Sequence, residues 1–122
     1  MGKLRIAGYW AAGCGGCEIA ALEIGDKILQ LAEVADIVFW PVAVDFKYHD
    51  VEQMADKSID VCLFNGAIRS SENEHIAKLL RAKSKVMVAY GSCAYEGCIP
   101  ALANLTNRQG IFNRVYIETP ST

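Results

Sequence analysis

The stretch Ala12-Gly13-Cys14-Gly15-Gly16-Cys17-Glu18 decides the fold predicted for this chain, because it separates a buried strand from a helix. Before it, residues 4–10 are mostly apolar, as is typical of a strand in a parallel sheet. After it, residues 19–35 carry apolar side chains mostly at spacings of three and four, which indicates a helix with one face on a sheet. Two cysteines thus lie in a glycine-rich turn between a strand and a helix.

The remainder of the chain continues this alternation. Further strands are predicted at residues 36–44, 59–64 and 85–90, and further helices at residues 51–55, 72–82 and 99–105, the last ended by residues 107–110. Pro41 places the second strand at a sheet edge or divides it in two. The alternation predicts an α/β fold, namely a flavodoxin-like three-layer sandwich with a mainly parallel sheet and helices on both faces. We expect a single domain over residues 1–122.

A second cysteine turn follows the predicted strand at residues 85–90. In Gly91-Ser92-Cys93-Ala94 a glycine appears where the strand ends and a cysteine lies just beyond it, with Cys98 five positions further along. The carboxyl ends of parallel strands meet at one edge of a sheet, where ligands bind. We therefore expect Cys93 to lie beside Cys14 and Cys17, and the two turns to form one shared site.

Composition narrows the class of protein. The chain has 122 residues, with 12 basic and 14 acidic residues and no cluster of Lys or Arg, which argues against a nucleic-acid partner. No apolar run approaches the roughly 20 residues that span a bilayer, so no membrane segment is expected. Five cysteines are many for an intracellular domain, where clustered thiols more often bind metal or carry out redox chemistry than form disulfides. We expect a cytoplasmic protein in which Cys62, within a predicted strand, is a buried apolar residue.

Three kinds of thiol chemistry are compatible with the two turns. Iron-sulfur clusters and structural zinc sites take up to four thiolates, and Cys-x-x-Cys before a helix also occurs in thioredoxin-like dithiols. A dithiol leaves the Cys93 turn without a role, and structural zinc is more typical of small loop-rich folds that lack a core. Backbone amides near sulfur tune iron-sulfur clusters, and five glycines leave such amides close to the cysteines: Gly13, Gly15, Gly16, Gly91 and Gly97. These surroundings favour a cluster.

Motifs along nearly the whole chain resemble the small subunit of nickel-iron hydrogenases, especially the F420-non-reducing (methyl-viologen-reducing) type that works with heterodisulfide reductase. That subunit belongs to the wider family of the 20 kDa subunit of NADH:ubiquinone oxidoreductase. The resemblance rests on these segments, in order: Gly13-Cys14-Gly15-Gly16-Cys17-Glu18, Trp40-Pro41-x-x-x-Asp45-Phe46-Lys47, Asn65-Gly66-Ala67-Ile68-Arg69, Gly91-Ser92-Cys93-Ala94, Gly97-x-Ile99-Pro100-Ala101-Leu102-Ala103-Asn104 and Glu118-Thr119-Pro120.

The resemblance implies a domain that holds the 4Fe-4S cluster nearest the nickel-iron centre of a large subunit and relays electrons away from it. Cys14, Cys17 and Cys93 match three of the family's cluster ligands. Glu18 matches an acidic residue of relatives and is a candidate for proton movement or for docking the large subunit, although an acid in the first turn of a helix is also favourable in itself. The implied partners are the nickel-iron large subunit and further iron-sulfur or heterodisulfide-reductase-type subunits that accept electrons.

The chain departs from the family pattern at the fourth cluster ligand. In relatives this ligand comes from a Pro-Gly-Cys-Pro-Pro-like segment well downstream of the Glu-Thr-Pro motif, and residues 1–122 contain no such segment. We therefore expect the amino-terminal part of a longer small subunit, with the fourth ligand downstream. Alternatively the site is completed by Cys98, at a position where relatives commonly have glycine.

Two other functions stay open at this point. One is the equivalent cluster-binding subunit of a complex-I-like quinone or ferredoxin oxidoreductase. Such subunits usually carry two adjacent cysteines in the first motif, so the spacing Cys14-Gly15-Gly16-Cys17 favours a hydrogenase. The other is a metal-stabilised interaction module without redox function.

Overall fold

The sheet is parallel throughout and has the predicted layout. The computed structural model describes residues 2–119 and 121. Its strands are β1 (Leu4–Trp10), β2 (Ala35–Phe39), β3 (Ile59–Asn65) and β4 (Ser84–Tyr90), arranged in the order β2-β1-β3-β4. This order is the beginning of the flavodoxin-like arrangement, so the predicted fold class is confirmed.

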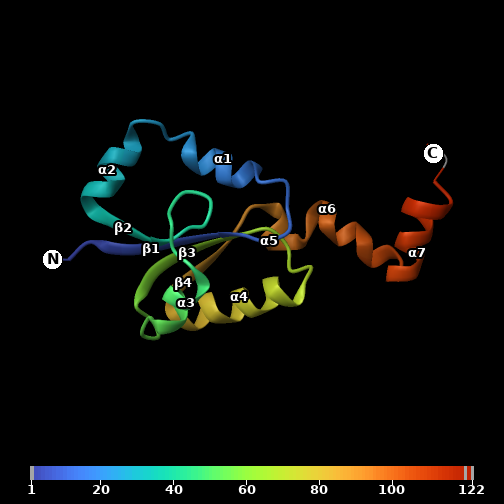
Figure 1. Ribbon diagram of the computed structural model, residues 1–122. Helices are drawn as coiled ribbons and strands as arrows, with labels where there is room; N and C mark the ends of the chain where they lie inside the picture. Colours follow the sequence, from blue (N-terminus) through green and yellow to red (C-terminus); the bar gives the residue numbers. More distant parts are fainter. Residues whose placement is uncertain (1, 120, 122) are drawn as a thin grey trace.

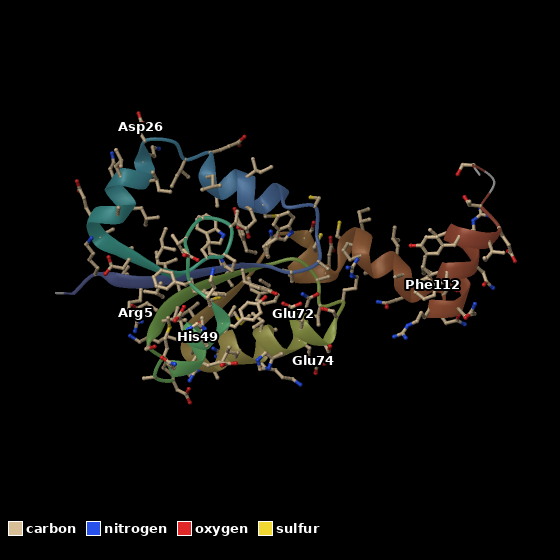
Figure 2. The ribbon with its side chains drawn as sticks, viewed as in Figure 1. Arg5, Asp26, His49, Glu72, Glu74 and Phe112 are labelled. Atoms are coloured by element: carbon tan, nitrogen blue, oxygen red, sulfur yellow. The ribbon has the colours of Figure 1, made fainter. Side chains whose placement is uncertain are left out.

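Helices cover both faces of the sheet, as Figure 1 shows. Helices α1 (Gly16–Leu22) and α2 (Lys27–Val34) lie on one face, and α3 (Tyr48–Gln53) and α4 (Ser71–Lys83) lie on the other. After β4 the chain forms α5 (Ser92–Glu96), α6 (Cys98–Ala101), the 3-10 helix η1 (Leu102–Leu105), α7 (Arg108–Phe112) and the π-helix η2 (Asn113–Ile117). From α6 onward these short helices extend away from the sheet, and Phe112 lies on this arm (Figures 1 and 2).

The well-packed core lies between the sheet and the α3/α4 layer. Ala7 pairs with Cys62 and Tyr9 with Phe64 across β1 and β3, so these side chains share one face. That face meets the buried side chains of the helices, and the core comprises Ala7, Tyr9, Phe39, Val51, Ile59, Cys62, Phe64, Ile76 and Leu80. Cys62 is 0% exposed, as predicted, and burial raises its pKa to about 12. It is therefore a structural residue.

The layer of α1 and α2 packs more loosely on the opposite face. A cavity of about 370 Å³ lies there, lined by side chains of both helices and of the sheet, among them Ile6, Leu63 and Trp40. The Trp40 ring lies over Gly8 of β1, because a Cβ atom at Gly8 would come within 2.8 Å of it. The apolar side chains of Leu29 and Val34 on α2 are exposed. The two faces of the sheet thus differ in packing.

Several predicted boundaries differ from those of the structure: the strand predicted over residues 36–44 is β2, which ends at Phe39, and the helix predicted over residues 51–55 is α3 (Tyr48–Gln53). The single helix predicted over residues 19–35 is divided between α1 and α2, and Gly25 adopts a left-handed φ of +58° in the turn that separates them. The helix predicted over residues 99–105 changes from α-helical to 3-10 geometry after Ala101. Residues 108–110, predicted as a break, belong to α7, because Asn107 caps that helix by accepting a hydrogen bond from the Gly110 amide at 2.8 Å.

The structure also bears on the predictions for Pro41, for the start of α4 and for the domain range. Strand β2 lies at a sheet edge, one of the two outcomes predicted from Pro41. Ser70 caps α4 by accepting a hydrogen bond from the Asn73 amide at 3.2 Å. Within the part of the chain that the structure describes, no helix combines the length and apolarity needed to cross a membrane. The single domain is predicted over residues 1–122, of which residues 1, 120 and 122 lie outside the described part of the chain. Residue 120 is the proline of the Glu118-Thr119-Pro120 motif.

Candidate metal centre

The first cysteine turn is tied to the end of β3. Ala11 donates a backbone hydrogen bond to the Asn65 carbonyl at 2.7 Å, and Ala12 and Ala67 exchange two such bonds of 3.0 and 2.7 Å. Gly66, with φ of +92°, allows this close approach, since a Cβ atom there would lie 2.8 Å from the Ala12 nitrogen. The segment that leads to Cys14 is therefore fixed against the central strand.

Cys14 and Cys17 flank the start of α1. Gly15 adopts a left-handed φ of +81°, which turns the chain into the helix. The Gly16 amide lies 3.4 Å from Cys14 Sγ and donates to it. The Trp10 ring covers Gly15, because a Cβ atom on this glycine would lie 2.7 Å from the ring. The turn therefore supplies a backbone donor to one of its sulfurs, the arrangement expected beside a metal-bound thiolate.

The second cysteine turn interlocks with the first. Gly91 has φ of +89° and precedes α5, which contains Cys93. A Cβ atom at Gly91 would collide with Cys17 Sγ, and one at Gly13 would lie 3.7 Å from Cys93 Sγ. A cysteine of each turn thus lies against a glycine of the other. The structure brings Cys14, Cys17 and Cys93 together at the carboxyl edge of the sheet.

Cys98 joins this group of thiols. Cys98 and Cys93 both line, with Cys14, a broad cleft of about 1760 Å³. Desolvation raises the pKa of Cys93 above its ordinary value, and the neighbouring thiols of Cys98, Cys14 and Cys17 raise this pKa further.

The donor set fits an iron-sulfur cluster. Soft thiolate ligands with adjacent glycine amides, as at Cys14, Cys17 and Cys93, are typical of the environment of such clusters. All five cysteines are free thiols, so none of these sulfurs is consumed by a disulfide. In residues 2–119 and 121, no three His, Cys, Asp or Glu side chains are placed so as to hold a single metal ion. The fit therefore rests on the identity of the donors and on the contacts between the two turns.

Glu18 lies beside Cys17 and is buried, with 5% of its surface exposed. Trp40 Nε1 donates a hydrogen bond to its Oε2, and Asn65 Nδ2 donates to its Oε1 at 3.3 Å. Sequence reasoning missed both partners, although each has a signal: Trp40 directly follows β2 and Asn65 ends β3, at the same sheet edge as the cysteines. The carboxylate is thus held by residues from the ends of two strands.

Comparison with known proteins agrees with this arrangement. The chain is 43% identical to the iron-sulfur subunit of the F420-non-reducing hydrogenase of Archaeoglobus profundus over 98% of its length. It is 35% identical to a subunit of the F420-non-reducing hydrogenase of Methanothermobacter thermautotrophicus, again over 98% of its length. The chain spans 37% of the length of each of these relatives.

A solved structure and a family match complete the comparison. The structure is similar to a chain in the crystal structure of an NAD+-reducing [NiFe]-hydrogenase in the H2-reduced state, with a TM-score of 0.79 and 28% identity, covering 93% of this chain and 59% of that one. Residues 14–119 match the family described as NADH ubiquinone oxidoreductase, 20 Kd subunit. The resemblance predicted from the motifs is confirmed, and the chain belongs to the NADH ubiquinone oxidoreductase 20 Kd subunit family.

Proposed function

We propose that this chain is the electron-transfer part of the small subunit of a nickel-iron hydrogenase complex, an oxidoreductase. The observation that carries the proposal is the interlocking of the two cysteine turns, in which Cys17 lies against Gly91 and Cys93 lies close to Gly13. The names of the relatives, which are hydrogenase subunits, support the same function. Hydrogen activation itself belongs to the large subunit in this proposal.

Cys14, Cys17 and Cys93 would hold a 4Fe-4S cluster. When bound, such a cluster accepts and releases single electrons at a potential set by its hydrogen bonds and its exposure to solvent. Residues of this chain would affect both the hydrogen bonds to the cluster and its exposure to solvent. The Gly16 amide donates to Cys14 Sγ, and the Trp10 ring covers Gly15 beside it and donates to the Gly13 carbonyl at 3.2 Å. These contacts fix the turn around Gly15, while Cys14 itself stays exposed.

An apolar surface surrounds the cysteine turns and would receive the nickel-iron large subunit. Trp10, Ile19 and Ile68 are 42%, 59% and 52% exposed. Aromatic and apolar side chains of this kind are typical of the centre of protein interfaces. Further iron-sulfur or heterodisulfide-reductase-type subunits would accept the electrons. A cytoplasmic location is part of the proposal, because five free thiols suit a reducing compartment.

The matched family also favours a second function, in a complex-I-like quinone or ferredoxin oxidoreductase. The separated cysteines of Cys14-Gly15-Gly16-Cys17 favour the hydrogenase. A metal-stabilised module without redox function is the remaining alternative. It predicts bound metal that is not reversibly reduced, so electron paramagnetic resonance of the reduced protein separates it from both redox functions.

Anaerobic reconstitution with iron and sulfide tests the proposal. We expect Cys14→Ala and Cys17→Ala each to lose most of the iron and labile sulfide that the unmodified chain retains after gel filtration, because each removes a thiolate ligand. Cys62→Ala is the matched control, since this cysteine is buried in the core, away from the cleft. Equal iron contents in all three variants would refute the ligand assignment.

We further propose that Glu18 moves protons rather than docks a partner. Its carboxylate is buried and both oxygens already accept hydrogen bonds, which leaves little surface for a neighbouring subunit. In the assembled complex, Glu18→Gln should slow proton exchange between hydrogen and water more than it slows the reduction of the chain by an artificial donor. Equal slowing of both would contradict a role in proton transfer.

The same substitution has a predicted effect on stability. Glu18→Gln keeps the shape of the side chain but exchanges a carboxylate for a neutral amide whose nitrogen is itself a donor, facing donors on Trp40 and Asn65. We expect a loss of about 1–3 kcal/mol of unfolding free energy in urea titrations. The exposed Glu23 provides the control, and Glu23→Gln should change stability by about 0.5 kcal/mol or less.

A further inference from the structure

The cavity of about 370 Å³ lies between the sheet and the layer of α1 and α2 (Figure 1), and its walls are almost entirely apolar. They include Ile6 of β1, Ile28 of α2 and Leu63 of β3. Among the described residues, none lines both this cavity and the cysteine cleft. An engineered apolar cavity of roughly 150 Å³ binds benzene, and small-molecule sites begin at about 300 Å³. The cavity is therefore large enough for an organic molecule of its own.

Glu18 is the charged residue of this cavity, among the described residues that line it. Its side chain is buried and accepts hydrogen bonds from Trp40 Nε1 and, at 3.3 Å, from Asn65 Nδ2. Each of these donors faces a different carboxylate oxygen. A protonated carboxyl group would need an acceptor at one of its oxygens, whereas an ionised one is an acceptor at both. The arrangement therefore suits a negatively charged Glu18.

The charge of Glu18 has no cationic partner within residues 2–119 and 121, where the ion pairs involve other carboxylates. Both of its hydrogen-bond donors are neutral, and its place in the first turn of α1 supplies only a partial positive charge. Buried charges are normally paired, because an isolated charge away from water is costly. A carboxylate also offers about four lone-pair sites, of which two are used here. Glu18 can therefore accept hydrogen bonds from a cation.

The cavity reaches the molecular surface. Ala20 of α1 and Ile24, in the turn after this helix, line the cavity and are both exposed. Gly25 separates α1 from α2 in the same turn, so the two helices cover the sheet as short separate segments. A small molecule can therefore approach the cavity from solvent at the side chains of this turn.

We propose that this cavity binds a small organic monoamine, whose ammonium group donates hydrogen bonds to Glu18 and whose apolar body fills the space between the helices and the sheet. The ammonium group supplies the positive charge that the chain lacks here, and an aromatic or branched aliphatic body matches the apolar walls. A hydrated metal ion fits less well, because it needs several oxygen ligands and the cavity offers one carboxylate. A bound amine would compete with the proton transfer proposed for Glu18, although its binding requires neither that role nor a cluster.

Titration of the metal-free chain with 2-phenylethylamine and with its neutral isostere 2-phenylethanol tests the proposal. The chain has two tryptophans, so the nitrogen-15 spectrum contains two indole N–H signals. The Trp40 indole donates to Glu18 in the cavity, whereas the Trp10 indole donates to the Gly13 carbonyl outside it. We expect saturable shifts of the Trp40 signal, an unmoved Trp10 signal, and a Kd for the amine about tenfold or more below that for the alcohol.

Three variants separate the charge from the shape of the cavity. Glu18→Gln should weaken binding of the amine to the level of the alcohol, because it removes the charge and leaves the apolar walls in place. Ala21→Leu adds carbon atoms inside the cavity and should weaken binding of both molecules about tenfold. Glu23→Gln is the matched control, since Glu23 is exposed at the end of the same helix, and it should leave both affinities unchanged. Circular dichroism establishes that each variant is folded.

Several outcomes would overturn the amine site. They are equal affinities for the amine and the alcohol, the same loss of amine affinity in Glu23→Gln as in Glu18→Gln, and the absence of a saturable Trp40 shift at millimolar amine. If Glu18→Gln does not fold, the comparison of the two molecules and the Ala21→Leu variant decide. None of these results bears on the proposed function, which the iron contents of Cys14→Ala and Cys17→Ala test separately.

Discussion

Cys93→Ala is expected to abolish binding of a four-iron cluster, with iron after reconstitution falling from about four per chain to near zero. Cys93 is the thiol at the centre of the group: it is close enough to Cys14, Cys17 and Cys98 for all three to influence its pKa. It also helps to link the two turns, since it lies beside Gly13. Its loss removes a ligand and one of the two contacts between the cysteine turns, the other being Cys17 against Gly91.

The control for this variant is again Cys62→Ala, in which the number of cysteines is the same. Circular dichroism and urea titration establish that both variants are folded. Iron content, labile sulfide and electron paramagnetic resonance then report the site alone. If Cys93→Ala retains a four-iron signal of normal intensity, Cys93 is not a ligand and the shared site at the sheet edge is wrong.

Gly91→Ala should damage both the fold and the site. Gly91 has φ of +89° and ψ of 163°, a region that is essentially restricted to glycine, and we expect a loss of about 1–3 kcal/mol of unfolding free energy. In addition, the new methyl group would collide with Cys17 Sγ and displace it. Iron retained after reconstitution should therefore fall several-fold, although no thiol has been removed.

The variant Gly25→Ala separates the effect of backbone strain on stability from the effect of the collision with Cys17 on iron binding. Gly25 also has a positive φ, of +58°, but a Cβ atom there would meet no other atom within 4 Å. This variant should lose about 1 kcal/mol of stability for the backbone conformation alone and retain its full iron content. If Gly91→Ala and Gly25→Ala bind equal amounts of iron, the contact between Gly91 and Cys17 does not shape the site.

The strands and helices that are marked by a few neighbouring residues, such as an apolar run or a capping serine, were predictable from the sequence. Strands β1, β3 and β4 coincide with short apolar runs, and Ser70 marks the start of α4 by the capping bond that it accepts. The break at Gly25 was missed because the apolar spacing continues through it, and an isolated glycine is tolerated within a helical pattern. The role of Asn107 as a cap was not predictable, because asparagine both ends and begins helices.

The candidate site was predictable to the level of topology. The rule that parallel strands end at one edge brings the two cysteine turns together, as the structure shows. The fitting of Cys17 against Gly91 was not predictable, because it depends on how two loops from different strands pack. The partners of Glu18 were missed for the same reason: Trp40 and Asn65 are 22 and 47 residues away from it along the chain.

The central claim is that Cys14, Cys17 and Cys93 bind one iron-sulfur cluster between them. Crystals of the anaerobically reconstituted chain, with diffraction recorded at the iron absorption edge, test it most directly. We predict anomalous density for several irons at the carboxyl edge of the sheet, within bonding distance of the Sγ atoms of all three cysteines. Iron bound elsewhere, or a single ion that leaves Cys93 unligated, would contradict the claim.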